Sequence, residues 1–227
     1  MSAAYNRLIL DFHGIGAKPV WVDADEDFYW CDEIATFAGI LDAIPEATKA
    51  TGLEIELTFD DGNASDSTIA APALAKRGLS ASFFVCAGRI GQLGYLDGPA
   101  MWDMMEAGMK IGSHGWSHID WRKADDVTLD QEVNGARRKI EDIIGRKVDN
   151  VAIPFGSYDR RVMNMLGAFD RIYTSDTGLV PVSGRIFPRW SYQKDWRADT
   201  LIRLAAISGG KVFIAQRALK MAIKRLR

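Results

Sequence analysis

The feature that most constrains the fold of this 227-residue chain is an alternation of short apolar segments with longer segments of helical periodicity. The short segments have the length and apolar character of buried strands, and the longer ones place apolar residues three or four positions apart. We expect strands at residues 7–12, 54–59, 81–87, 109–112, 150–153 and 171–174, and helices at 37–51, 67–77, 98–108, 129–145 and 160–169. This alternation predicts an α/β fold with a largely parallel sheet.

Residues suited to chemistry follow several of the expected strands directly. They are Asp60, Asp61, His114, His118, Phe155 and Asp176, and His13 ends the first strand. Because sites in parallel α/β folds collect at the carboxyl ends of the strands, we expect these residues to lie at one edge of the sheet.

Two adjacent carboxylates, Asp60 and Asp61, stand before Gly62. Neighbouring side chains on a strand point to opposite faces, so one acid can bind a cation while the other accepts a proton. Like charges this close require a counter-charge or an altered pKa. Asp-Asp-Gly is also a common turn, so this stretch alone leaves a turn and a site open.

His114 and His118 are four residues apart, and the nearby Gly112 and Gly115 favour a loop over a helix. Two histidines and one carboxylate form a typical catalytic zinc set, which leaves a coordination position open. An isolated pair at this spacing can also be two unrelated histidines. The presence of Asp60 and Asp61 elsewhere in the chain favours the metal interpretation.

The composition excludes some functions and suggests a compartment. A net charge of −2 argues against a general nucleic-acid-binding protein. Cys31 and Cys86 show no CxxC pattern and are expected to be free thiols in a reducing compartment. No apolar run is long enough to span a membrane, and the N-terminus lacks the apolar core of a signal peptide. We therefore expect a single cytoplasmic domain over residues 1–227.

Three motifs carry a family resemblance: TFDDG at residues 58–62, SHGWSH at 113–118 and PFG at 154–156. In order and spacing, over residues 55–180, they resemble the polysaccharide deacetylases, the NodB-like group of carbohydrate esterase family 4. The resemblance implies an irregular (β/α) barrel of about seven strands. It also implies hydrolysis of an N-acetyl or O-acetyl group on a sugar polymer.

The resemblance implies roles for residues of the three motifs. It implies that Asp61, His114 and His118 hold a divalent metal, usually zinc, with Asp60 as the general base. It also implies that the backbone N–H of Phe155 donates to the oxyanion.

Four further residues are expected to contact the oxyanion or the carbohydrate substrate. They are Trp116, Asp176, Arg189 and Trp190, of which Trp190 is equally consistent with a place in the core.

Two positions depart from the family pattern. Ala152 stands where many members have an arginine that holds the base, and Arg189 or Arg161 is the candidate replacement. The usual catalytic histidine near the last strand is also missing, since no histidine follows His118. We assign proton donation to His13, because the first strand of a closed barrel lies near the last.

The partner of His13 remains open at this stage. Asp11 or Asp176 would orient its ring or raise its pKa. Without His13 as the acid, the leaving amine would take its proton from metal-bound water, or catalysis would be weak.

Residues 17–33 form an expected loop in which aromatic residues stand among acids: Trp21, Phe28, Tyr29 and Trp30. Such a loop suits the rim of a sugar-binding site. The alternative, which the composition favours slightly, is a loop that its aromatic side chains pin to the body.

The C-terminal segment, about residues 211–227, is predicted to be a basic amphipathic helix. Val212, Leu219, Ile223 and Leu226 share one face, and Arg217, Lys220, Lys224 and Arg227 share another. The apolar face would pack on the body, or the helix would lie on an anionic membrane surface. A cytoplasmic deacetylase needs a cytoplasmic sugar, and a lipid-linked exopolysaccharide precursor would supply one.

The sequence therefore favours a metal-dependent N-deacetylase of a polysaccharide or its lipid-linked precursor. Three alternatives remain. The chain could be an inactive carbohydrate-binding relative in a biosynthetic complex, an O-acetyl esterase, or a hydrolase of small cyclic amides.

Overall fold

The computed structural model describes residues 5–20 and 27–226. Within them, one sheet of nine strands has the order β7-β1-β2-β3-β4-β5-β6-β8, with β9 beside β1. The strands are β1 (Tyr5–Phe12), β2 (Glu54–Phe59), β3 (Ala81–Val85), β4 (Lys110–Ser113), β5 (Asn150–Ala152), β6 (Arg171–Thr174), β7 (Leu179–Pro181), β8 (Ile186–Pro188) and β9 (Trp190–Ser191).

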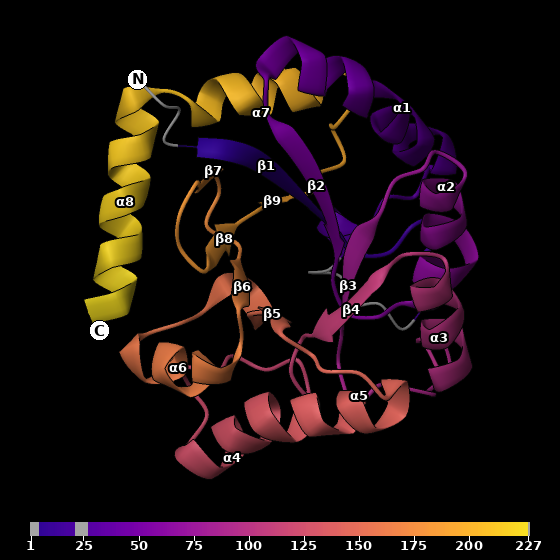
Figure 1. The fold of residues 1–227 in the computed structure, drawn as a ribbon, viewed down its shortest axis with the longest axis vertical. Coiled ribbons are helices and arrows are strands. Elements are labelled where there is room, and N and C mark those ends of the chain that lie inside the picture. The colour runs from indigo at the N-terminus through magenta and orange to yellow at the C-terminus, as the bar shows by residue number, and fades with distance from the viewer. Residues whose placement is uncertain (1–4, 21–26, 227) are drawn as a thin grey trace.

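The helices form a ring around this sheet (Figure 1). They are α1 (Ile34–Thr51), α2 (Ala71–Ala75), α3 (Gly98–Glu106), α4 (Asp126–Asp130), α5 (Ala136–Ile144), α6 (Arg160–Met165), α7 (Thr200–Ser208) and α8 (Lys211–Leu226). Asp97, Asp125 and Asp159 begin α3, α4 and α6, because each carboxylate accepts a hydrogen bond from a first-turn amide.

Two of the expected helices contain a π-helical turn. Residues Asp66–Ala70 (η2) lead into α2, and residues Gln131–Gly135 (η3) join α4 to α5. Such turns are frequent at functional sites, because they shift the register of the side chains that follow.

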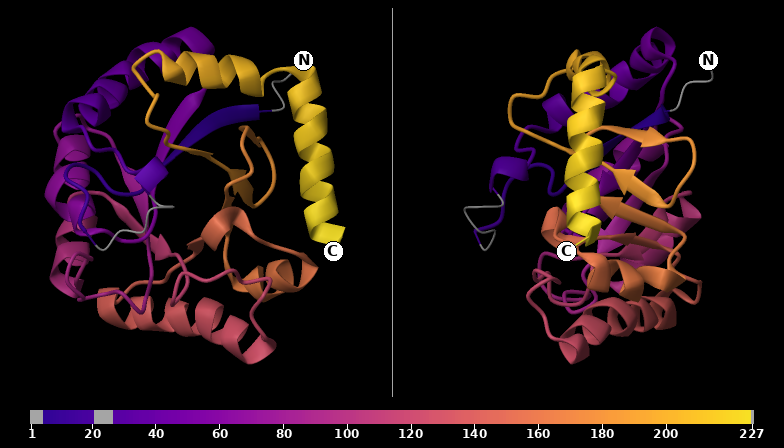
Figure 2. Two further views of the ribbon diagram at one scale, coloured as in Figure 1. Left: turned by 180° about the vertical axis from the view of Figure 1, so that it is seen from behind. Right: turned by 90° about the vertical axis from the view of Figure 1, so that its left-hand side faces the viewer.

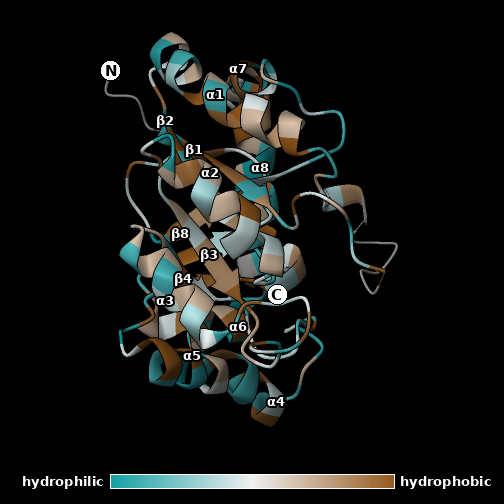
Figure 3. Cartoon of the chain, turned by 90° about the vertical axis from the view of Figure 1, so that its right-hand side faces the viewer, coloured by the Kyte–Doolittle hydropathy of each residue, from teal (hydrophilic) through white to brown (hydrophobic). Residues whose placement is uncertain are grey.

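The side chains of the strands alternate between two hydrophobic cores. Leu8, Leu10 and Phe12 of β1 point outward and pack under the helices, whereas Ile9 belongs to a smaller cluster inside the barrel. The Phe59 ring stacks on that of Phe12, with centroids 5.5 Å apart, and on that of Phe83 in β3, with centroids 4.6 Å apart. Figure 3 shows the strands mostly in hydrophobic brown, while the helices around them also carry hydrophilic residues.

The barrel closes through the segment at residues 186–191, which changes its partner strand at Arg189. Before this residue, β8 pairs with β6, and after it, β9 pairs with β1. The first strand therefore lies beside the last segment of the sheet, and the expected α/β barrel of about seven strands is confirmed. Strands β1–β6, β8 and β9 run parallel, and the sequence did not predict antiparallel β7 or the short strands β8 and β9.

Helix α8 lies along one side of the barrel (Figure 2). Its expected apolar face does not pack on the body: Val212 is 71%, Leu219 63%, Ile223 43% and Leu226 83% exposed. The opposite face is turned inward instead, because Arg217 donates to the carbonyl of Leu179 and Lys224 reaches the carboxylate of Asp176.

Among the described residues, no helix combines the length and apolar character needed to cross a bilayer.

Candidate active site

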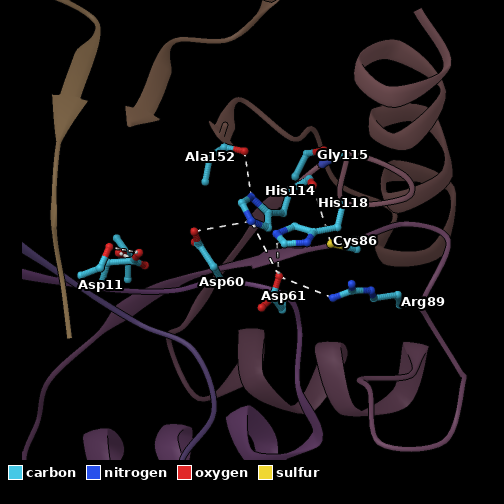
Figure 4. A network of polar contacts seen from close by, with 12 residues as sticks. Asp11, Asp60, Asp61, Cys86, Arg89, His114, Gly115, His118 and Ala152 are labelled. Atoms are coloured by element: carbon cyan, nitrogen blue, oxygen red, sulfur yellow. Dashed lines mark hydrogen bonds and ion pairs between the residues drawn. The ribbon is translucent and has the colours of Figure 1, made fainter. Parts of the chain in front are cut away.

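The predicted metal ligands meet at the carboxyl ends of β2 and β4. Asp61 follows β2, and His114 and His118 lie in the loop that follows β4. One ligand atom from each of the three lies within 4.8 Å of the others. Figure 4 shows both imidazoles beside Asp60 and Asp61.

The distances suit a small cation. The Asp61 Oδ1 atom lies 3.4 Å from His118 Nε2 and 3.7 Å from His114 Nε2. Zinc bonds of about 2.0–2.2 Å place neighbouring tetrahedral ligand atoms about 3.3–3.6 Å apart. Among the described residues, no group donates a hydrogen bond to this buried oxygen. Of the cations that the structure describes, the nearest to it is Arg89, whose Nη1 lies 3.5 Å away in an ion pair (Figure 4). A buried carboxylate oxygen that makes no hydrogen bond and faces two imidazole nitrogens fits the place of a metal ligand.

A backbone carbonyl on the side of the ring away from Asp61 sets the tautomer of His114. Its Nδ1 lies 2.9 Å from the carbonyl oxygen of Ala152, so Nδ1–H donates there and Nε2 keeps its lone pair. Burial lowers the pKa of His114 to about 4, so the ring is neutral near pH 7. A neutral imidazole oriented by a backbone carbonyl is the form that binds metals.

Backbone strain concentrates at the same place. In the described part of the chain, three non-glycine residues have a positive φ: Asp61 at 78°, His118 at 56° and Phe155 at 57°. A left-handed conformation at such residues costs on the order of 1–2 kcal/mol. The sequence predicted all three as site residues. The strained backbone conformations therefore lie at the candidate active site, where such strain commonly occurs.

Glu132, which the sequence did not single out, holds the histidine loop in place. This buried residue lies in η3, and its carboxylate accepts hydrogen bonds from the backbone N–H groups of Trp116 and Ser117 and from the Trp121 indole. The features that mark Glu132, its burial and its place in a π-helical turn, are visible only in the structure.

The base candidate, Asp60, is clamped by Arg189. Nη1 and Nη2 of Arg189 each donate to one carboxylate oxygen of Asp60 at 2.7 Å, and Nη1 also lies 2.8 Å from Asp11. Arg189 thus takes the place left vacant by Ala152. The other candidate, Arg161, binds Asp126 and backbone carbonyls near the surface.

The two acids on Arg189 titrate differently. Burial raises the pKa of Asp60, but the charge and hydrogen bonds of Arg189, with the nearby His114, hold it well below its ordinary value. Burial and the charge of Asp60, opposed by Arg189, raise the pKa of Asp11 to about 7. Because their surroundings shift the pKa values of these two acids in opposite directions, Asp60 is ionised beside the candidate metal ligands.

His13 lies next to these acids. One ring nitrogen of His13 and one oxygen each of Asp11 and Asp60 lie within 4.8 Å of one another. Burial lowers the pKa of His13, but the negative charges of Asp11, Asp61 and Asp60 outweigh it, so this pKa is raised. Because Arg189 already neutralises Asp11 and Asp60, this second cluster is a poor site for a cation.

The walls of the site are partly aromatic. Phe155 is 63% exposed, and its ring lies 4.6 Å from that of His118. Trp116 is half-buried and packs over Gly88, where an added Cβ would come within 3.0 Å of the indole. Tyr29 stacks on His13 with ring centroids 5.3 Å apart.

In the described part of the loop at residues 17–33, Trp30 supports the interpretation of a loop that is pinned to the body. Trp30 is buried and donates from its indole to the Gly16 carbonyl, which pins the loop to the body. Phe28 and Tyr29 remain exposed. Trp21 lies outside the described residues.

Two expected substrate contacts lie elsewhere. Trp190 stacks on Phe213 and donates to Ser208, so it packs between the barrel and the outer helices. The reason is strand alternation: Arg189 points inward, and Trp190 must point outward. Asp176 is buried, and its oxygens are occupied by Tyr158 and Lys224, so it orients neither substrate nor His13 directly.

Comparison with known families matches the polysaccharide deacetylase family over residues 48–170, more than half of the chain. The chain belongs to the polysaccharide deacetylase family. This deacetylase-family chain is 27% identical over 127 residues to the peptidoglycan-N-acetylglucosamine deacetylase PgdA of Listeria monocytogenes. It is 24% identical over 107 residues to the putative polysaccharide deacetylase YxkH of Bacillus subtilis.

These matches cover 55% and 47% of this deacetylase-family chain, but only 26% of PgdA and 38% of YxkH. Among solved structures, Streptococcus pyogenes deacetylase PplD, in complex with acetate, superposes with a TM-score of 0.76 at 18% identity, over 89% of this chain and 99% of that one. IcaB from Ammonifex degensii gives a TM-score of 0.72 at 18% identity, over 91% and 98%. At these identities the superpositions establish the shared NodB-like barrel.

Proposed function

We propose that this protein hydrolyses acetyl groups from N-acetylated sugars of a polysaccharide or its lipid-linked precursor, with a divalent metal, zinc, as cofactor. The observation that carries the proposal is an ionised carboxylate, Asp60, clamped beside three converging metal ligands. A carbohydrate-binding relative has no use for such a clamped base. Family membership supports the same reaction class.

Asp61, His114 and His118 would hold the metal. When bound, it supplies a Lewis acid at the carbonyl oxygen and lowers the pKa of water. Asp60 accepts the proton of the attacking water, and Arg189 fixes the direction in which its oxygens point. The backbone N–H of Phe155 is the proposed donor to the oxyanion.

His13 is the proposed donor of a proton to the departing amine. Because its pKa is raised, His13 stays protonated to a higher pH than a free imidazole does. In the described part of the chain its Nδ1 atom is buried and has no hydrogen-bond partner, so the hydrogen-bonding capacity of this nitrogen is unused. Asp11 is the acid whose charge raises this pKa most, and we assign it the orienting role.

The aromatic groups on either side of the site suit a sugar. Phe155 lies against His118, and Tyr29 lies over His13. Sugar rings offer apolar C–H faces to such rings, and their hydroxyl groups suit the polar centre.

The decisive experiment measures acetate release from N-acetylated and O-acetylated oligosaccharides, using the zinc-loaded protein. We expect release from the N-acetylated substrate, abolished by a chelator and restored by zinc. Faster release from the O-acetylated substrate would indicate an esterase instead. Sugar binding without release of acetate from either substrate would indicate the inactive carbohydrate-binding relative.

We also propose that α8 rests on the cytoplasmic face of an anionic membrane, where a lipid-linked substrate would be presented. Its outer face exposes Val212, Leu219, Ile223 and Leu226, while residues 211–227 contain no acid. Both features favour an anionic lipid surface. Replacing Leu219 and Leu226 with serine should abolish co-sedimentation with anionic vesicles. Val127→Ser, at an exposed position on α4, should leave it unchanged, and equal binding of all variants would refute the proposal.

A further inference from the structure

We propose that Lys224, on the inner face of α8, is a positioning residue that holds the turn carrying Phe155. The inference rests on the proposed function, because Phe155 is the proposed donor to the oxyanion. It assigns to the C-terminal helix a direct part in the geometry of the site.

The ammonium of Lys224 connects two loops at the carboxyl end of the barrel. Its Nζ donates to the carbonyl oxygen of Gly156 at 3.0 Å and to Oδ1 of Asp176 at 2.6 Å. Gly156 belongs to the turn Pro154–Gly156 (η4) after β5, and Asp176 follows β6. One side chain from the end of the chain therefore bridges both loops.

A third group completes the cluster. The hydroxyl of Tyr158 donates to Oδ2 of Asp176 at 2.7 Å, and Nζ of Lys224 lies 4.8 Å from the centre of the Tyr158 ring. Asp176 is 1% exposed, so Lys224 supplies the positive charge that this buried carboxylate requires. These contacts hold Lys224, Tyr158 and Asp176 in place beside the Phe155 turn.

The backbone of this turn is strained and requires restraint from its surroundings. Phe155 has a φ of 57°, a conformation that persists only where the surroundings enforce it. Gly156 also has a φ of 57° and lies so close to Ser175 that an added Cβ would be 2.9 Å from its Cβ. The hydrogen bond from Lys224 restrains the Gly156–Ser157 peptide, two peptide units after the one that carries the Phe155 amide, and so holds the C-terminal side of the turn.

The test compares Lys224→Met, which keeps the apolar stem, with Lys224→Arg and with Lys220→Ala on the exposed side of the same helix. Within the turn, the amides of Gly156 and Ser157 bond to the carbonyls of Ile153 and Pro154. We expect hydrogen exchange of these two amides to rise about tenfold in Lys224→Met. Exchange should be restored by Lys224→Arg and unchanged in Lys220→Ala.

In the zinc-loaded enzyme, kcat should fall about tenfold to a hundredfold in Lys224→Met, with KM unchanged and partial rescue in Lys224→Arg. Unchanged exchange at Gly156 and Ser157 would overturn the inference. So would an equal rise in Arg217→Met, which removes another contact of α8, because helix docking alone would then hold the turn. If the wild type releases no acetate but the exchange result holds, the deacetylase proposal fails and the role of Lys224 stands.

Discussion

Arg189 binds both carboxylate oxygens of Asp60, although 129 positions separate the two residues. The contact forms where the segment at residues 186–191 passes from β6 to β1. It explains how a chain with alanine at position 152 still clamps its candidate base. The stabilising cation comes from the segment that closes the barrel.

Replacing Arg189 with methionine should destabilise the fold by about 3–5 kcal/mol, because Asp60 and Asp11 would lose the cation buried between them. Arg161→Met removes a pair with the exposed Asp126 and a hydrogen bond to the Ala124 carbonyl near the surface, and should cost less, about 1–2 kcal/mol. Urea unfolding of both variants measures the difference. Equal losses would show that the buried clamp contributes no more than a surface pair.

Asp60→Asn should lower the rate of acetate release by about 10²–10⁴-fold, the usual contribution of a general base. Zinc content should remain at the wild-type level, because Asp60 is not among the proposed ligands. Asp61→Asn is the matched variant and should lose zinc. A zinc-free Asp60→Asn protein would contradict the division of roles between the two acids.

His13→Gln should lower deacetylation by about 10²-fold or more while zinc stays bound. The raised pKa of His13 places its loss of the proton above the ordinary value of 6.5. Activity that depends on this proton should therefore decline with rising pH in the wild type, and the decline should be absent from the variant. Wild-type activity in His13→Gln would exclude this residue as the acid.

Glu132→Gln should weaken zinc binding by about 10–100-fold, as loss of a group that orients metal ligands commonly does. The amide has one acceptor oxygen, so it cannot satisfy the Trp116, Ser117 and Trp121 donors that the carboxylate serves. Glu141→Gln, in α5 of the same helical segment, removes a carboxylate that binds Arg137 and the Val148 amide. It should leave zinc affinity unchanged, and equal losses in the two variants would contradict the role of Glu132.

Asp11→Asn should change how stability depends on pH. Because the folded-state pKa of Asp11 is raised to about 7, its contribution is fully present below about pH 4 and is lost as pH rises through 7. Each unit of pKa shift corresponds to about 1.4 kcal/mol. Relative to the wild type, the variant should gain stability between pH 4 and pH 8 in urea unfolding. A constant difference across this range would show that Asp11 ionises normally.

The sequence predicted the parts of the site that lie within short motifs. Asp60, Asp61, His114 and His118 each follow a strand of a parallel sheet, so strand order alone brings them together. The place of His13 beside Asp60 could also be predicted, because a closed barrel returns its last segment to the first strand.

What the sequence could not settle depends on contacts between distant segments. Arg189 and Arg161 were equal candidates until barrel closure placed one of them inside. The sequence leaves Trp190 open between a substrate contact and a place in the core, and alternation from the inward Arg189 turns it outward against the core. The orientation of α8 depends on Leu179 and Asp176, which accept hydrogen bonds from its basic face and leave its apolar face exposed.

The change of partner strand at Arg189 ties the closure of the barrel to the candidate base. The guanidinium that clamps Asp60 sits at the point where the segment leaves β6 and joins β1. Closing the barrel and orienting this carboxylate are therefore a single step of assembly, whereas the three candidate metal ligands come from strands that precede it.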